Sequence, residues 1–273
     1  EFLFMERRTA PGEDEQFEAC ATVARAMAGR GLVIVRTLDV GGDKPLAYLP
    51  MESEANPFLG ERGVRVSLAR PALFRTQLRA IVRAAAEGRV AVMFPMVSTL
   101  AELREARALL DAERAALGAP AIPVGIMVET AAAAVLADRF AAECDFLSIG
   151  TNDLTQYVLA MDRTNPRLAP QVDALAPPVL RTIAATCEGA RRHGKWVGVC
   201  GALAGDPAAV PVLVGLGVAE LSVDIPLVPA IKARVRALDA AACRETARLV
   251  LDCDDGAAVR ALVAARHPEE VAA

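Results

Sequence analysis

Residues 146–163 read FLSIGTNDLTQYVLAMDR, and this stretch decides the fold. It begins as a short apolar strand at 146–149 and breaks at Gly150, and it presents Asn152 and Asp153 before a helical pattern of apolar residues follows. A strand that leads into a helix is the repeating unit of parallel α/β folds, which bind ligands at the carboxyl ends of their strands. The alternative is that the two polar residues only cap the helix.

The composition is that of a chain with a large apolar core and no basic field. The chain has 273 residues, 54% of them hydrophobic, and a formal net charge of −4. This charge argues against nucleic acid as a partner. No apolar run approaches the roughly 18 residues of a membrane span, and no signal peptide opens the chain. Six cysteines without a C-x-x-C pair indicate reduced thiols, so we expect a cytoplasmic protein without a membrane span.

Strand-like and helix-like segments alternate along the chain, which is typical of a parallel sheet with crossover helices. Strands are expected at 2–5, 32–35, 62–68, 90–96, 122–128, 146–149, 196–200 and 221–223. Helices are expected at 13–30, 71–87, 99–117, 177–193, from 206, and near 229–238, 243–251 and 257–266. If the opening segment is the tail of a truncated first strand, the chain has eight strands. We therefore predict one α/β domain over residues 1–273, a (β/α)8 barrel of the TIM type with additional C-terminal helices.

Polar and ionisable residues gather at, or within four residues beyond, the carboxyl ends of the expected strands. They are Arg36, Glu129, Asn152, Asp153 and Cys200. Barrel enzymes place their chemistry on this face, because loops converge there on a rigid sheet. Arg62 joins the group if its short strand forms, although it would lie at the start of that strand.

Six motifs occur in an order that resembles a known family. They are RTLDVGGDK at 36–44, NPFLGERGVR at 56–65, MFPM at 93–96, GIMVET at 125–130, GTNDLTQY at 150–157 and VGVCG at 197–201. Together they resemble the C-terminal, phosphoenolpyruvate-binding barrel of enzyme I of the bacterial phosphotransferase system, including fructose-type multiphosphoryl transfer proteins. Pyruvate phosphate dikinases and phosphoenolpyruvate synthases share GTNDLTQ and the Cys-Gly pair, so a barrel of that type is an alternative. The RTLDVGGDK form favours enzyme I.

The resemblance implies a phosphoenolpyruvate-protein phosphotransferase. Such a barrel binds phosphoenolpyruvate with Mg²⁺ and donates its phosphoryl group to a histidine on a separate N-terminal domain, releasing pyruvate. Through that domain the group reaches a histidine phosphocarrier protein, as the first step of sugar uptake. The chain begins without methionine, and we expect a fragment of a longer, homodimeric multidomain protein. We do not expect the fragment alone to sustain turnover, because His193 and His267 lie in contexts unlike that of the acceptor histidine.

The resemblance also implies roles for charged residues. Glu129 and Asp153 match the family's magnesium ligands, and two carboxylates with substrate oxygens and water suit octahedral Mg²⁺. Either acid alone could equally be solvated or cap a helix. Arg36 and Arg62 match arginines that hold the phosphate, where a planar guanidinium can spread its hydrogen bonds over several oxygens. Surface ion pairing is the alternative for both arginines.

The remaining matches concern groups around the phosphate, the carboxylate and the methylene carbon of the substrate. Asn152 and Arg163 match groups that, with Asp153, hold the phosphate and the carboxylate. Arg163 follows Asp153 by ten residues, so it must return to the mouth of the barrel after the helix. Cys200 matches the acid that protonates the methylene carbon of the enolate, which a thiol at a strand end can do.

Four positions depart from the family pattern. Ala202 follows the Cys-Gly pair where glutamate is common, and Ala131 follows V-E-T where proline is common. Ala91 replaces an arginine of many members, and Asp224 occupies a strand end that is often small. These departures concern the polar shell around the substrate. They leave a second interpretation open, in which the chain is a degenerate regulatory or dimerisation module.

Overall fold

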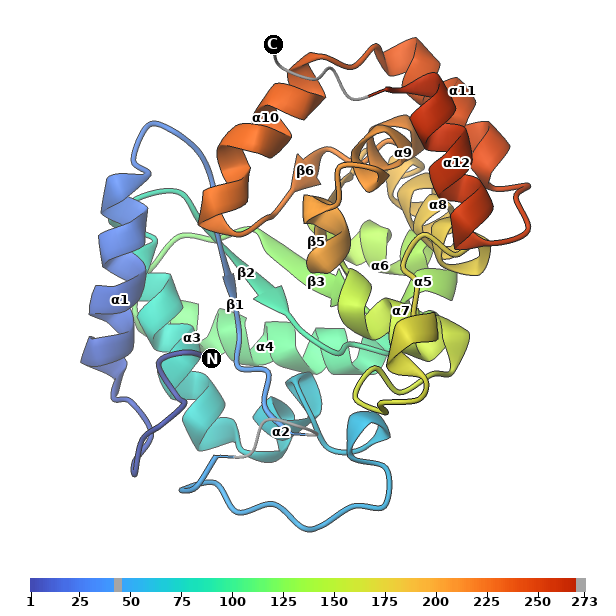
Figure 1. Cartoon of the computed structure of the whole chain (residues 1–273). Coiled ribbons are helices and arrows are strands. Elements are labelled where there is room, and N and C mark those ends of the chain that lie inside the picture. Colours follow the sequence, from blue (N-terminus) through green and yellow to red (C-terminus); the bar gives the residue numbers. More distant parts are fainter. Residues whose placement is uncertain (42–45, 269–273) are drawn as a thin grey trace. The chain divides into compact units, whose positions relative to one another are not determined.

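The computed structural model describes residues 1–41 and 46–268. Residues 42–44, the end of the RTLDVGGDK motif, therefore lie outside the described residues. The chain divides into two compact units, Glu1–Met127 and Val128–Ala273, which are described in turn (Figure 1). The assignment of residues 1–273 to one domain stays a prediction.

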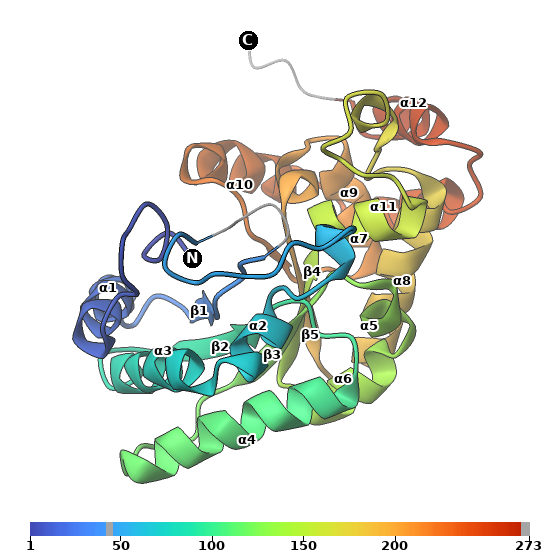
Figure 2. The ribbon, with the colours of Figure 1, turned by 90° about the horizontal axis from the view of Figure 1, so that it is seen from below.

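The first unit contains parallel strands separated by helices. Its elements are α1 (Glu13–Ala26), β1 (Val33–Arg36), η1 (Pro57–Leu59), α2 (Val64–Ala69), α3 (Pro71–Ala84), β2 (Val90–Phe94), α4 (Leu100–Ala116) and β3 (Val124–Val128), whose last residue begins the second unit. β2 pairs in parallel with β1 and with β3. α3 contacts both α1 and α4, so these helices form one layer over the strands (Figure 2).

α4 begins at a capping box formed by Thr99 and Glu102. The Thr99 side chain accepts a hydrogen bond from the backbone nitrogen of Glu102 at 3.2 Å. The Glu102 carboxylate accepts in return from the backbone nitrogens of Thr99 at 2.8 Å and Ser98 at 2.7 Å. Three donors that no helical carbonyl could reach are thereby satisfied, which fixes where the helix begins.

Two of the expected strands are wrong, and both lie in the first unit. Residues 62–68 are mostly helical, because α2 covers Val64–Ala69. Its buried residues Val64, Val66 and Ser67 follow a helical spacing that a six-residue segment does not reveal by period alone. Residues 2–5 form a turn in which the backbone nitrogen of Phe4 donates to the Glu1 carbonyl at 2.8 Å.

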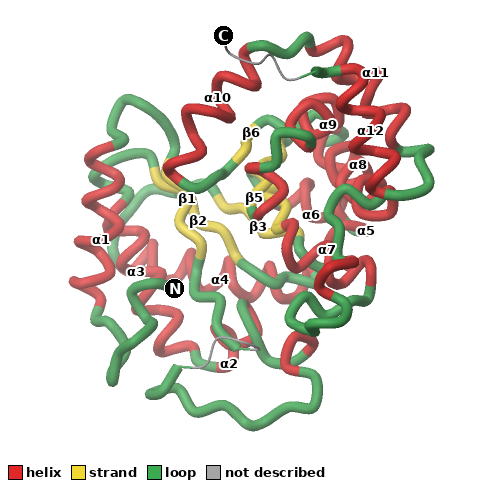
Figure 3. The backbone as a smooth tube through the Cα atoms, viewed as in Figure 1, coloured by secondary structure: helices red, strands yellow, loops and turns green. Residues whose placement is uncertain are grey.

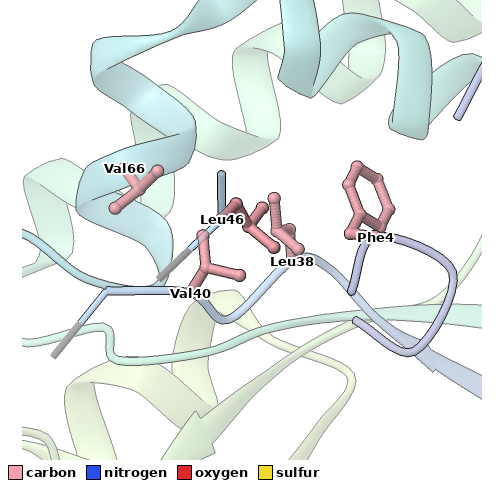
Figure 4. Packing of buried hydrophobic residues seen from close by; sticks show 5 residues of the cluster. All are labelled: Phe4, Leu38, Val40, Leu46 and Val66. Carbon is pink, nitrogen blue, oxygen red and sulfur yellow. The ribbon is translucent and has the colours of Figure 1, made fainter. Parts of the chain in front are cut away.

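The apolar character of the opening turn serves a small hydrophobic cluster instead of a strand. Phe4, Leu38, Val40, Leu46 and Val66 are all buried and pack together (Figure 4). Burying one such side chain stabilises a fold by about 1.5–3 kcal/mol. The cluster thus joins the first residues of the chain to the loop after β1 and to α2.

The second unit repeats the pattern. Its elements are α5 (Ala131–Val135), α6 (Ala137–Glu143), β4 (Phe146–Gly150), α7 (Thr151–Leu159), η2 (Ala169–Gln171), α8 (Pro177–Arg191), β5 (Trp196–Cys200), η3 (Ala202–Gly205), α9 (Ala209–Leu216), β6 (Glu220–Leu221), η4 (Ile225–Leu227), α10 (Val228–Arg236), α11 (Ala240–Val250) and α12 (Gly256–Arg266). β5 pairs in parallel with β4 and with β6 (Figure 3).

The paired strands β4 and β5 have two unlike faces. Leu147, Ile149, Val197 and Val199 alternate along one face and are buried, and α8 contacts both strands. The other face begins with the stacked rings of Phe146 and Trp196, and toward its carboxyl end it carries small residues, with Ser148 opposite Gly198 and Gly150 opposite Cys200. The second face therefore leaves space for a ligand near Cys200.

The described residues contain six strands, parallel wherever their pairing is given above, and helices separate them. This confirms the predicted α/β class with the strand–helix repeat of a barrel. The two strands missing from the expected eight are the segments at 2–5 and 62–68. No helix in the described part of the chain is both long and apolar enough to cross a membrane.

Candidate active site

An arginine pair shares one buried carboxylate in the first unit. The Nη1 atom of Arg36 lies 3.2 Å from Oδ2 of Asp39, and Nη2 of Arg62 lies 3.4 Å from both carboxylate oxygens. Arg36 also forms an ion pair with Glu1. The structure thus brings together the two arginines that the sequence analysis selected, and Asp39 is the group that joins them.

Two glycines allow the loop that carries Arg62 to approach the loop after β1. Gly41 has φ +103°, and a Cβ atom there would lie 2.4 Å from the Glu61 carbonyl oxygen. Gly63 has φ +57°, and its Cβ would lie 2.6 Å from the Cβ of Met96. Any side chain at either position would displace the backbone on both sides of Arg62.

The two arginines differ in exposure. Arg62 is 1% exposed and Asp39 2% exposed, so this ion pair lies in a low-dielectric environment where each charge depends on the other. The side chain of Arg36 is 27% exposed. Arg36 is therefore the more accessible cation, whereas Arg62 would have to exchange part of its contact with Asp39 for a ligand.

Two buried acids follow strand ends in the second unit. Glu129 comes directly after β3 and is 1% exposed, and Thr130 beside it caps α5 by accepting from the backbone nitrogen of Ala133 at 3.1 Å. Asp153 lies in the first turn of α7 and is 7% exposed. A carboxylate in that turn is stabilised by the helix dipole.

These acids suit a magnesium ion better than a metal held by protein ligands alone. No group of three or more His, Cys, Asp or Glu side chains within residues 1–41 and 46–268 could hold a metal ion. Mg²⁺ commonly takes one or two protein carboxylates and fills its remaining positions with water and substrate oxygens. The donor set of Glu129 and Asp153 fits that requirement.

Arg163 returns to Asp153, as its predicted role requires. α7 ends at Ala160 in the left-handed region with φ 52°, which reverses the chain. The backbone nitrogen of Arg163 then donates to the Gln156 side chain at 3.0 Å, and Nη2 of Arg163 lies 3.4 Å from Oδ1 of Asp153. The guanidinium therefore lies beside the predicted metal ligand, where it could also contact a substrate carboxylate.

The helix that follows β4 also holds the loop that follows β5. The Thr151 hydroxyl donates to the carbonyl of Cys200 at 2.9 Å, and the Asn152 side-chain oxygen accepts from the backbone nitrogen of Ala202 at 3.0 Å. Asn152 is exposed, and no described residue accepts a hydrogen bond from its side-chain nitrogen. Asn152 thus positions the Cys200 loop and keeps a donor that could serve a ligand.

Gly201 is the position where this loop tolerates a side chain least. Its φ is +90°, and an added Cβ would lie 2.6 Å from Oγ1 of Thr151 and 3.0 Å from Oδ1 of Asn152. Gly217 has nearly the same φ, +92°, with nothing within 4 Å of its Cβ position.

We expect Gly217→Ala to cost about 1–2 kcal/mol from backbone strain alone. Gly201→Ala should cost about 1–3 kcal/mol more, because the methyl group overpacks the Thr151 and Asn152 contacts. Urea unfolding of both variants measures the difference. Equal losses of stability would show that the contact of Gly201 with α7 does not constrain the Cys200 loop.

Cys200 lies at the carboxyl end of β5 beside a cavity of about 430 Å³. Its Sγ atom lies 3.7 Å from the Ser148 hydroxyl and 3.5 Å from the Ile149 carbonyl oxygen. The cavity is lined by Asn152, Cys200, Gly201, Ala202, Gly205, Ser222, Val223, Asp224 and Leu227. Two of the departures from the family pattern, Ala202 and Asp224, therefore line the same cavity as the predicted acid.

Burial sets two other thiols apart. All six cysteines are free. Burial raises the pKa of Cys187 to about 12, and burial also raises the pKa of Cys20. Cys187 lines a separate cavity whose lining shares no residue with that of the Cys200 cavity.

The two histidines also differ. His193 is exposed at the end of α8. His267 is buried, and its Nε2 lies 2.8 Å from the Thr246 hydroxyl. Burial lowers the pKa of His267, and Arg234 and Arg266 lower it further. His267 does not belong to the residues that line the Cys200 cavity.

Sequence reasoning missed three residues of the site: Asp39, Ser148 and Thr151. Asp39 lies inside the RTLDVGGDK motif, three residues after Arg36, and the other two lie in the FLSIGTND stretch. Their signal was position alone, at or beside a strand end. Asp39 contacts Arg62, and Ser148 and Thr151 contact Cys200, and all three contacts join residues that are far apart along the chain.

Comparisons with known proteins agree on one family. The sequence model of a family described as "PEP-utilising enzyme, PEP-binding domain" matches residues 1–240. A multiphosphoryl transfer protein of Xanthomonas campestris pv. campestris is 53% identical over 98% of this chain and 32% of its own length. Phosphoenolpyruvate-protein phosphotransferases of Haloferax volcanii and of Bacillus sp. (strain S) are 50% and 49% identical, over 95% and 90% of this chain and 47% and 44% of their own lengths.

The chain spans between 32% and 47% of the lengths of these relatives, which are therefore longer proteins. A citrate lyase structure from Burkholderia xenovorans matches 92% of this chain and 78% of its own chain with a TM-score of 0.50 and 20% identity. At that identity the likeness concerns the fold alone, and it agrees with the α/β class described above.

Proposed function

The chain belongs to the family of the PEP-binding domain of PEP-utilising enzymes, and from this premise we propose that it binds phosphoenolpyruvate with Mg²⁺ and donates the phosphoryl group to a histidine of another domain. The observation that carries the proposal is two buried carboxylates, Glu129 directly after β3 and Asp153 in the first turn of the helix after β4, with Arg163 beside Asp153. The names of the relatives favour a phosphoenolpyruvate-protein phosphotransferase over a dikinase or synthase.

Phosphate recognition falls to the arginines. Phosphoryl transfer asks a protein mainly for positioning and charge neutralisation. Arg36 has the more exposed guanidinium, and Arg62 is held beside it by Asp39. We assign both to the phosphate oxygens, with Asp39 fixing their orientation.

Further substrate contacts are assigned to groups of the second unit. Asn152 keeps an amide donor for a phosphate oxygen, and Arg163 can pair with the substrate carboxylate. Asp153 would then serve both the metal and the substrate. When bound, Mg²⁺ supplies positive charge to the phosphate and to the developing enolate. Glu129 and Asp153 are the residues that would hold it.

Cys200 completes the reaction. As the P–O bond breaks, the phosphoryl group moves to the acceptor histidine and the enolate of pyruvate remains. The thiol of Cys200 gives its proton to the methylene carbon, which converts the enolate into pyruvate. The location of Cys200 beside a cavity at a strand end supports this role.

The acceptor histidine is proposed to lie in the part of the longer relatives that this chain does not match. A histidine phosphocarrier protein would receive the group next, in sugar uptake by an assembly that contains two copies of the barrel. Neither His193 nor His267 lies among the residues that line the Cys200 cavity, so neither suits an in-line transfer.

A reconstitution with phosphate-labelled phosphoenolpyruvate tests the proposal. The chain is incubated with labelled phosphoenolpyruvate and Mg²⁺ in two reactions. One contains no other protein, and the other contains a separately produced piece of the Xanthomonas relative, taken from the part that precedes the region matched by this chain. We expect acid-labile label on the added piece, with one pyruvate released for each phosphate transferred. The chain alone should give neither product. Stable label on His193 or His267, or no label on any protein, would contradict the proposal.

A further inference from the structure

A buried hydroxyl lies against the Cys200 thiol. Ser148 is 5% exposed on β4, and its Oγ donates to Sγ of Cys200 across a distance of 3.7 Å. Because Ser148 pairs with Gly198, two residues before Cys200, the two side chains project from the same face of the paired strands. The register therefore places one hydroxyl diagonally beside the thiol.

Two of the described neighbours of the thiol have opposite preferences for its protonation state. The Ile149 carbonyl oxygen lies 3.5 Å from Sγ and can only accept, so it favours the protonated thiol. The Ser148 hydroxyl can donate, and a donor favours the thiolate. We infer that Ser148 is a positioning residue that holds the Cys200 side chain and stabilises the thiolate left behind when Cys200 gives its proton to the enolate. This inference rests on the proposed function of Cys200.

No second proton transfer is needed for this role. Ser148 keeps its own proton throughout, because an alkyl hydroxyl is a far weaker acid than a thiol. The electron pair of the S–H bond stays on sulfur, and the proton forms the new C–H bond of pyruvate. Water that enters the cavity beside Cys200 can reprotonate the thiolate after pyruvate leaves.

The surroundings of the Ser148 and Cys200 pair bear on the charge of the thiol. Gly150 and Gly198 contribute no side chains to this face. Two acids lie on neighbouring segments: Asp224 lines the same cavity, and an added Cβ at Gly198 would lie 3.6 Å from Oε1 of Glu220. Burial raises the pKa of Glu220. Negative charge on these acids opposes a thiolate, so a neutral donor is the group that can favour it.

Alkylation of Cys200 tests the inference without substrate. Iodoacetamide reacts with the thiolate, so the pH midpoint of its rate reports how readily the thiol loses its proton. Cleavage after Lys195 and Lys232 gives a peptide of residues 196–232 in which Cys200 is the only cysteine. Mass spectrometry of this peptide therefore follows Cys200 among six cysteines.

We expect Ser148→Ala to raise the midpoint by about one pH unit, the scale of one hydrogen bond to a charged group. Ser222→Ala is the matched control, because Ser222 lines the same cavity and makes no hydrogen bond to Sγ among the described contacts. Ser148→Thr keeps the hydroxyl and should restore the wild-type midpoint. Circular dichroism and thermal unfolding show whether each variant folds.

The result that overturns the inference is an unchanged midpoint in a folded Ser148→Ala variant, or an equal shift in Ser222→Ala. If Ser148→Ala does not fold, Ser148→Thr is compared with the wild type instead. A midpoint about one pH unit higher in a folded Ser148→Thr variant would also overturn the inference. Failure of the proposed function would show differently. The chain would not bind phosphoenolpyruvate, whatever the alkylation midpoints of its variants.

Discussion

Replacing Glu129 by Gln or Asp153 by Asn should weaken Mg²⁺-dependent binding of phosphoenolpyruvate by at least about 100-fold, the loss that even the supporting residues of metal sites can cause. Both side chains are buried at strand ends, and each substitution removes one negative charge with little change of shape. Binding measured without Mg²⁺ should change far less. Calorimetric titration of each variant, with and without the metal, measures both quantities.

The control for these variants is an acid of the second unit outside the site. Glu188 forms surface ion pairs with Arg191 and Arg192 on α8, and Glu188→Gln should bind like the wild type. A double variant of Glu129 and Asp153 that kept its Mg²⁺-dependent affinity would contradict the metal assignment.

Replacing Arg62 by Ala should destabilise the first unit by about 3–5 kcal/mol, because Asp39 would remain buried with one partner removed. The 1% exposure of Arg62 and the 2% exposure of Asp39 are the reason for so large an effect. A double variant, Arg62→Ala with Asp39→Asn, should lose less than the sum of the two single variants, because neither charge is left behind. Urea unfolding of the four proteins gives the coupling free energy.

Arg25 is a suitable comparison within the same unit. It forms an ion pair with Glu87 at 2.9 Å, and its side chain is 47% exposed. Arg25→Ala should therefore cost no more than about 1 kcal/mol. If the losses of unfolding free energy for Arg62→Ala and Asp39→Asn simply add in the double variant, the buried pair is not coupled as its geometry indicates. Equal losses for Arg25→Ala and Arg62→Ala would have the same meaning.

The sequence was most informative where a buried strand runs directly into a helix. The stretch at 146–163 contains β4, α7 and the return of Arg163, as predicted. The reason is that β4 is short, mostly apolar and buried throughout, and the change to helical period after Gly150 admits few other structures. The capping box of Thr99 and Glu102 was equally predictable, because both partners lie within one turn.

Short apolar segments misled the prediction for a physical reason. Residues 2–5 and 62–68 contain too few residues to separate a strand from a turn or a single helical turn by period. Their conformations depend on tertiary contacts, such as the burial of Phe4 against Leu38 and Val40. Nothing local in the sequence announces those contacts.

The site was predictable by residue type and position, but its internal contacts were not. Arg36 and Cys200 could be selected because each ends a strand. The partners Asp39 and Ser148 could not, because the contact of Asp39 with Arg62 depends on the path of two loops and that of Ser148 with Cys200 depends on the register of two strands. The dual role of Asn152, which holds the Ala202 backbone nitrogen, likewise required the structure.

Calorimetric titration of the wild-type chain with phosphoenolpyruvate, with and without Mg²⁺, tests directly whether the chain binds this substrate with the metal. We expect saturable binding at one site per chain that strengthens markedly when Mg²⁺ is present. We also expect Glu188→Gln to reproduce this curve and Asp153→Asn not to reproduce it. Absence of binding under both conditions, from a chain shown to be folded, would contradict the proposed function and favour a module that has lost its substrate.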